Sequence, residues 1–113
     1  MAVKEKLVRD VAVLEVSGKL MGGNETKEVH EHVKRLISDG IIKVVIDLSK
    51  VNWLNSQGIG MLIACYTSLR RNEGDLRIAG ATEKVNSILL LIRVNTIFEC
   101  FETVDQAVSS FSK

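Results

Sequence analysis

The spacing of hydrophobic residues changes along this chain and predicts an alternation of strands and helices. Residues 11–16, Val-Ala-Val-Leu-Glu-Val, form a β-strand pattern, and a weaker strand is expected just before them over 3–9. The Arg9-Asp10 pair is short enough for a hairpin turn, so these two strands should be antiparallel, with Gly18 ending the second. Residues 41–48 are almost continuously apolar and β-branched, which is typical of a central strand covered on both faces. Shorter strands are predicted over 76–79 and 97–101.

Helical spacing fills the segments between these strands. It predicts helices over 24–38 and 57–71, one capped by Thr82, and one opened by a Thr103 capping box. Asn24 is a suitable N-cap for the first, and Gly40 a suitable end. The order β-β-α-β-α-β-α-β-α predicts an α/β domain. Its small mixed sheet should combine a leading antiparallel hairpin with a parallel centre and about four helices. A functional site should then lie at the carboxyl ends of the strands.

Composition narrows the function classes. The 113 residues suit one domain, spanning 1–113, and 46% apolar residues exclude disorder. A net charge of +1 argues against a nucleic-acid binder. The chain shows neither a membrane-span pattern nor a secretory signal, so a cytoplasmic protein is expected. The two cysteines and two histidines lack metal-ligand spacing, and we expect neither a metal nor a cofactor.

Catalytic patterns are weak in this sequence. Ser56 directly precedes a predicted helix and reads first as its N-cap. As a nucleophile it would need His30 or His32 with Asp47, but these histidines fall on a predicted surface helix and the nucleophile-elbow motif is absent. The pair Gly58 and Gly60 has Ile63 where a dinucleotide fingerprint needs a third glycine. The sequence therefore predicts a protein that is not an enzyme.

Some apolar residues exceed what one buried helix face needs. Met61, Ala64, Cys65 and Ser68 form a second stripe, which predicts a partner surface. The third predicted helix likewise has more apolar residues than one buried face needs, namely Leu90, Leu91 and Val94. Trp53 is interpreted as a loop anchor on the core, and Cys65 and Cys100 as small core residues, so for Cys65 both interpretations remain open.

The segment Val44–Met61 carries a family resemblance. Its Asn-Ser-Gln-Gly-Ile-Gly is similar to the Asp-Ser-Ser-Gly-Leu-Gly motif of STAS-domain proteins of the bacterial anti-sigma factor antagonist type. The segments 16–20 and 97–107 also resemble family landmarks, so the similarity covers the whole chain. It implies that Ser56 is phosphorylated by a partner, an anti-sigma factor that is also a serine kinase. Only the unphosphorylated protein would bind that partner, and a serine phosphatase would reset the switch.

The resemblance also implies a partner surface and marks departures from the family. Asn55 replaces the usual Asp, Gln57 the second serine, Met21 an Asp, and Arg93 a helix-ending glycine. The expected partner-binding residues lie around the motif and the preceding glycine turn: Met21, Gly22, Asn24, Asn55, Gln57, Gly58, Ile59, Met61 and Cys65. The protein itself should be a monomer or weak dimer.

Two other functions remain open. The chain could be the STAS subunit of a lipid-transport ABC complex, binding its ATPase without serine phosphorylation. It could also be a small nucleotide-binding STAS domain that uses residues 21–24 and the helix start at Ser56, because a glycine turn before a helix can hold a phosphate on backbone amides. No Walker lysine follows that turn.

Overall fold

The structure, a computed structural model, describes residues 3–91, 93 and 96–112. They form a five-stranded sheet with the strand order β1-β2-β3-β4-β5. β1 (Val3–Val8) pairs antiparallel with β2 (Val11–Leu20). β3 (Lys43–Leu54), β4 (Asp75–Ala79) and β5 (Cys100–Phe101) continue the sheet in parallel. The predicted mixed sheet with a leading hairpin is confirmed, although β5 covers only the end of the strand expected over 97–101.

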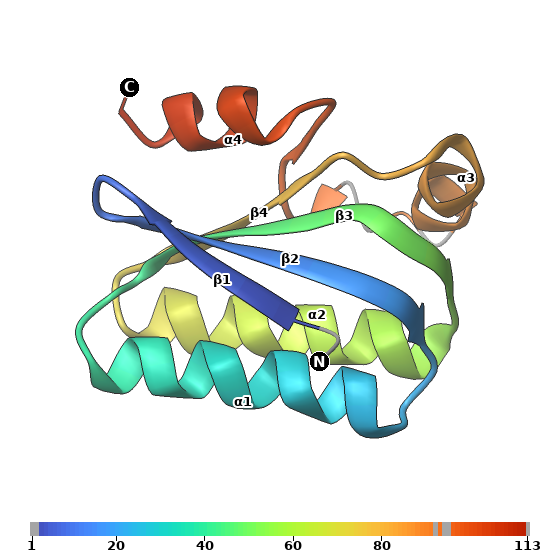
Figure 1. The fold of residues 1–113 in the computed structure, drawn as a ribbon, viewed down its shortest axis with the longest axis horizontal. Coiled ribbons are helices and arrows are strands. Elements are labelled where there is room, and N and C mark those ends of the chain that lie inside the picture. Colours follow the sequence, from blue (N-terminus) through green and yellow to red (C-terminus); the bar gives the residue numbers. More distant parts are fainter. Residues whose placement is uncertain (1–2, 92, 94–95, 113) are drawn as a thin grey trace.

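Helices cover both faces of this sheet (Figure 1). α1 (Asn24–Ser38) and α2 (Ser56–Arg71) lie on one face, and α4 (Val104–Ser110) lies on the other. α3 (Glu83–Leu91) lies toward the carboxyl end of β3. The described helices include none that is long and apolar enough to cross a membrane.

The central strand supplies both hydrophobic cores. Val44 and Ile46 of β3 belong to the larger core, which α1 and α2 cover, whereas Val45 between them belongs to the smaller core under α4. Successive side chains of a strand point to opposite faces, so a continuously apolar strand can serve two helical layers at once. The predicted burial of this strand on both faces is confirmed.

β2 and β3 extend further than the sequence pattern indicates. Gly18 does not end β2; its φ of +96° falls at an irregularity in the pairing, and β2 continues beside β3 to Leu20. β3 continues to Leu54, so Trp53 lies in a strand and not in a loop. Trp53 is 39% exposed, so its interpretation as a loop anchor on the core is wrong.

Helix boundaries agree with the predictions to within a residue or two. Thr82 and Thr103 accept hydrogen bonds from the backbone N–H groups of Val85 and Gln106, which confirms both as caps. Asn24, by contrast, is the first residue of α1, and Gly23 occupies the cap position without a side-chain bond.

Four further predictions concern the end of α1, the residues after α3 and Cys100. Gly40 follows α1 with a φ of +81°, as expected of a helix-ending glycine. Arg93 adopts the same left-handed conformation at +60°, although it is not glycine. Val94, predicted as an extra apolar residue of the third helix, lies outside the described residues. Cys100 is exposed, so its prediction as a core residue is wrong.

Candidate functional site

The candidate site lies where the carboxyl ends of β2 and β3 meet the amino ends of α1 and α2 (Figure 1). Two connections form it: residues 21–23 between β2 and α1, and Asn55 between β3 and α2. Parallel pairing of β2 with β3 up to Leu20 and Leu54 brings these connections side by side. This is the carboxyl edge of the sheet, where the sequence predicts a functional site.

Asn55 holds the two connections together. Its side-chain Oδ1 accepts hydrogen bonds from the backbone N–H groups of Gln57 at 3.0 Å and Gly58 at 3.1 Å. Its own backbone N–H donates to the Leu20 carbonyl at 3.2 Å, and its Nδ2 donates to the Met21 carbonyl at 3.5 Å. Asn55 is therefore the N-cap of α2, and the prediction that Ser56 is the cap is wrong.

Two glycines permit the close contact between these connections. A Cβ on Gly58 would overlap the Leu20 carbonyl oxygen, so only glycine lets α2 approach β2 this closely. Gly22 has a φ of +91°, and a Cβ there would overlap the Gln57 side chain. The backbone N–H of Gly22 donates to Thr26 Oγ1 at 2.9 Å, which fixes the loop against the first turn of α1.

Ser56 is the first residue of α2 and is exposed to solvent. Within the described part of the chain, no residue forms a hydrogen bond with its hydroxyl group. The first turn of α2 carries no acidic side chain. The amino end of a helix has a partial positive charge, which favours an anion at this position.

The predicted partner surface is only partly accessible. Gly58, Ile59, Met61 and Cys65 are all buried, with Ile59 at 3% and Cys65 at 0% exposure. The predicted second stripe of α2 is therefore wrong for Met61 and Cys65, because α1 packs beside α2 and buries it. Burial also raises the pKa of the Cys65 thiol to about 12. Met21, Asn24 and Gln57 are exposed, and Gly22 and Asn55 are half-buried.

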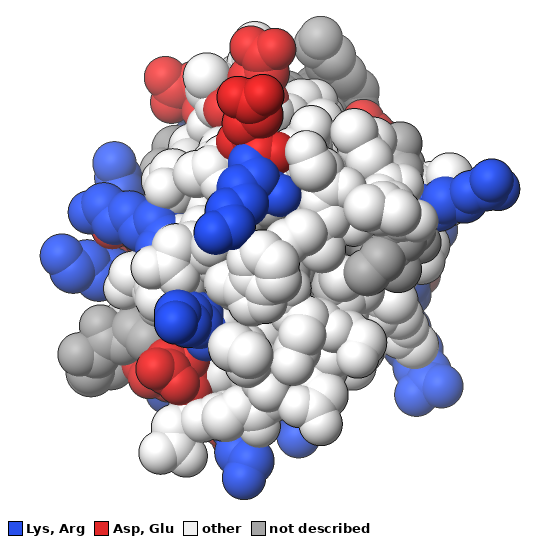
Figure 2. Space-filling view, turned by 90° about the vertical axis from the view of Figure 1, so that its right-hand side faces the viewer, with Lys and Arg blue, Asp and Glu red and all other residues white. Residues whose placement is uncertain are grey.

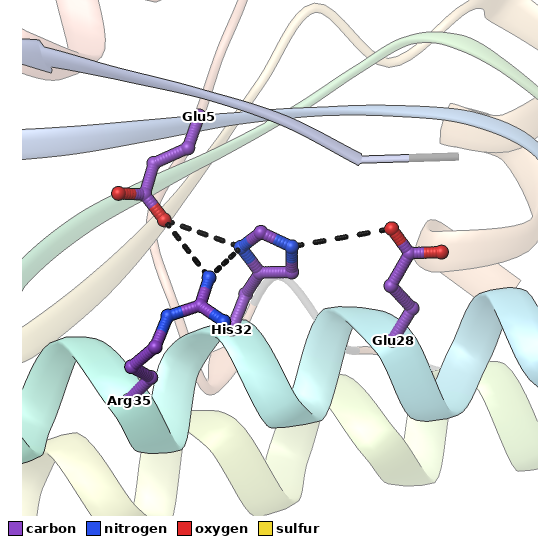
Figure 3. A network of polar contacts seen from close by, with 4 residues as sticks. All are labelled: Glu5, Glu28, His32 and Arg35. Atoms are coloured by element: carbon purple, nitrogen blue, oxygen red, sulfur yellow. Dashed lines mark hydrogen bonds and ion pairs between the residues drawn. The ribbon is translucent and has the colours of Figure 1, made fainter. Parts of the chain in front are cut away.

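Neither histidine is positioned as a general base for Ser56. His32 is buried against β1, not on a surface as predicted; its Nδ1 lies 3.2 Å from Glu5 Oε1 and 3.0 Å from Arg35 Nη2 (Figure 3). Its Nε2 lies 3.9 Å from Glu28 Oε2. His30 is half-buried, and desolvation lowers its pKa. The Asp47 carboxylate accepts a hydrogen bond from the Ser49 backbone N–H at 3.0 Å, and among the described residues no hydrogen bond joins it to either histidine.

A hollow of about 350 Å³ adjoins this edge. It is lined by Lys19, Met21, Asn52, Trp53 and Lys84. Uncharged residues cover most of the face at this end of the molecule (Figure 2). Lys19, Asn52 and Lys84 are not among the residues that the sequence predicts for the site. They lie there because β2 and β3 continue further than the local pattern indicates, which sets Lys19 beside Trp53. Across the described ranges, no group of His, Cys, Asp or Glu could hold a metal ion.

Comparisons with known proteins identify the fold. The sequence model of the STAS domain family matches residues 3–107. A candidate anti-sigma factor antagonist from Thermotoga maritima has a TM-score of 0.89 at 21% identity, with 98% of this chain and 95% of that chain covered. An anti-sigma factor antagonist from Mycobacterium paratuberculosis has a TM-score of 0.84 at 24% identity, covering 98% and 93%. The phosphorylated form of the Bacillus cell fate determinant SpoIIAA has a TM-score of 0.74 at 12% identity, covering 97% and 99%.

The same fold also occurs in a different setting. A sulfate transporter family protein from Wolinella succinogenes has a TM-score of 0.71 at 15% identity, covering 93% of this chain and 87% of that chain. At these identities the similarity concerns the fold, and the function has to be argued from the site.

Proposed function

This chain belongs to the STAS domain family, and on that premise we propose that it is an anti-sigma factor antagonist controlled by phosphorylation of Ser56. Unphosphorylated, it binds an anti-sigma factor that is also a serine kinase. Phosphorylated, it releases that partner, and a serine phosphatase restores binding. The protein acts in the cytoplasm, where ATP supplies the phosphoryl group, and it catalyses no reaction itself.

The exposed Ser56 hydroxyl is the observation that carries this proposal. It lies at the amino end of α2, and no described residue holds it by a hydrogen bond. Because Asn55 caps the helix, Ser56 is free for modification without loss of the cap. Gln57 offers no second acceptor in the motif, so the switch has one position.

The physical consequence of phosphorylation differs between the free protein and the complex. A phosphoryl group adds about −1.5 to −2 charges at neutral pH. At the amino end of α2 this charge faces solvent and a favourable helix dipole, so the free fold tolerates it. A partner that covers Ser56 would desolvate the same dianion without a counter-charge, at a cost of several kcal/mol. Phosphorylation therefore changes binding without changing the fold.

The test uses the purified kinase partner, ATP and matched serine variants. Wild type should gain one phosphate on Ser56, and Ser56→Ala should gain none. Ser49→Ala is the control, because Ser49 is an exposed serine of β3 outside the motif, and its loss should leave phosphorylation unchanged. Calorimetry should show that Ser56→Ala keeps the affinity of wild type and that the phosphorylated protein binds at least tenfold more weakly, equivalent to about 1.4 kcal/mol. Equal affinity of both forms contradicts the proposal.

One alternative has structural support of its own. The sulfate transporter family protein shares this fold, so a STAS domain that binds a transporter subunit permanently is a second candidate. In that case Ser56 would remain unmodified, and Ser56→Asp would bind the partner as well as wild type does. Phosphate incorporation at Ser56, together with the affinity of Ser56→Asp, therefore separates the two candidates.

A further inference from the structure

We propose that the hollow between Lys19, Trp53 and Lys84 docks an acidic segment of the protein partner, with Trp53 as the apolar anchor. This inference rests on the proposed function, because it concerns the same partner and the same edge of the sheet. It adds the chemistry of the partner surface: at least one carboxylate beside an apolar side chain.

The strand register creates this hollow. Lys19 of β2 and Trp53 of β3 are direct partners in the parallel pairing. The next residues, Leu20 and Leu54, are buried in the core under α1 and α2. Side chains alternate along a strand, so Lys19 and Trp53 project to the opposite face of the sheet. There Lys84 of α3 places its Nζ 5.0 Å from the centroid of the Trp53 ring.

The charge of the hollow selects an anion. Its five lining residues include two lysines and no carboxylate. The neighbouring Glu83 lines a different hollow together with Ala81. Neither Lys19 nor Lys84 has an ion pair with a carboxylate among the described residues. Complementary charge across an interface raises the association rate and selects the partner.

The exposed aromatic ring indicates a protein partner. Trp53 is 39% exposed and Met21, at the same hollow, is 45% exposed. Tryptophan is a frequent energetic centre of protein interfaces, because its ring buries a large apolar area.

Proximity connects this hollow to the switch. Met21 lines the hollow, and its carbonyl accepts a hydrogen bond from Asn55, the residue before Ser56. A partner seated on Trp53 would therefore reach the phosphorylation site. Phosphate on Ser56 would then repel the acidic segment, in addition to its own desolvation cost.

The first experiment measures affinity for the purified kinase partner. Lys19→Glu and Lys84→Glu should each weaken binding about tenfold, with a larger effect at low salt. Lys34→Glu is the matched control: it changes the same charge at an exposed position of α1 and should stay within about twofold of wild type. Trp53→Ala should weaken binding roughly thirtyfold, and Trp53→Phe should retain most of the affinity. If wild type binds but both glutamate variants behave like Lys34→Glu, the inference is wrong while the proposed function stands.

The second experiment needs no kinase. Trp53 is the single tryptophan, so its fluorescence reports directly on the hollow. The peptide Glu-Glu-Leu-Glu-Glu should change this fluorescence saturably at concentrations up to roughly 10 mM, and Lys-Lys-Leu-Lys-Lys should not. The response should disappear in Lys19→Glu and Lys84→Glu. No response to the acidic peptide, an equal response to the basic one, or a tighter response to ATP or GTP overturns the inference. If the kinase does not bind wild type, the proposed function fails and this titration still decides the docking site.

Discussion

Two glycines of α2 provide a stringent test of the site geometry. Gly58 faces β2, and a Cβ there would overlap the Leu20 carbonyl oxygen and lie 2.9 Å from the Leu20 Cβ. Gly60, two residues later in the same helix, is exposed, and a Cβ there would meet nothing within 4 Å. Gly58→Ala and Gly60→Ala thus make the same chemical change in the same helix with different surroundings.

The expected free energies have opposite signs. Alanine in place of glycine stabilises a helix by about 1 kcal/mol, and Gly60→Ala should gain roughly this amount. Gly58→Ala gains the same helix propensity, but its methyl group must also displace backbone atoms of Leu20, which cannot rotate away as a side chain could. Overpacking costs about 1–3 kcal/mol and sometimes more. Because the overlap is with backbone atoms, we expect a cost of about 2–3 kcal/mol here. Gly58→Ala should then lower the free energy of unfolding by roughly 1–2 kcal/mol, and the two variants should differ by about 2–3 kcal/mol.

Urea unfolding followed by Trp53 fluorescence would measure this difference, and thermal melting should separate the variants by roughly 10 °C in a domain of this size. Gly58→Ala should also weaken partner binding, because α2 and the end of β2 at Leu20 must move apart to make room for the added methyl group. A Gly58→Ala protein as stable as Gly60→Ala would refute the close contact between α2 and β2, and with it the arrangement of the site.

Three other predictions follow from the same structure. Asn55→Ala should lower the free energy of unfolding in urea by about 1 kcal/mol, because it removes two capping hydrogen bonds. Ser56→Ala should change the same free energy by less than about 0.5 kcal/mol, and the reverse order would assign the cap to Ser56. A thiol reagent at pH 8 should modify the exposed Cys100 in the native protein. Cys65 should react only after unfolding, because burial raises its pKa to about 12, and rapid labelling of both cysteines in the native protein would contradict this burial. Desolvation lowers the pKa of His30 below 6.5, so the contribution of His30 to stability is present above pH 6.5 and is lost as the pH falls through the folded pKa. His30→Gln should therefore make the urea midpoint less sensitive to pH between 7 and 5, and an unchanged pH dependence would count against this prediction.

The fold was largely predictable because the spacing of apolar residues indicates which side chains are buried. The continuous apolar run in β3 indicated a strand covered on both faces, and the structure divides Val44 and Val45 between two cores. Thr82 and Thr103 were predicted as caps because their position before an apolar period is a local property of the chain. The motif around Ser56 was likewise visible, since it directly follows that strand.

The details of the site depended on contacts between distant segments. Asn55 and Ser56 are both suitable caps, and the hydrogen bonds of Asn55 to Leu20 and Met21 decide between them. Met61 and Cys65 follow a helical period that fits either a surface or a second buried face. The packing of α1 beside α2 makes that face part of the core.

Local sequence patterns are sufficient for the order of elements and for the position of Ser56 at the start of a helix, because each follows from neighbours within a few residues. The mixed sheet then follows from that order of elements. Which side chains are accessible around Ser56 depends instead on contacts between distant segments. Lys19, Trp53 and Lys84 are far apart in the sequence, and they meet because β2 continues past Gly18 beside β3 while α3 lies over the same edge. Strand pairing and helix packing set these distances, and no local pattern of residues encodes them.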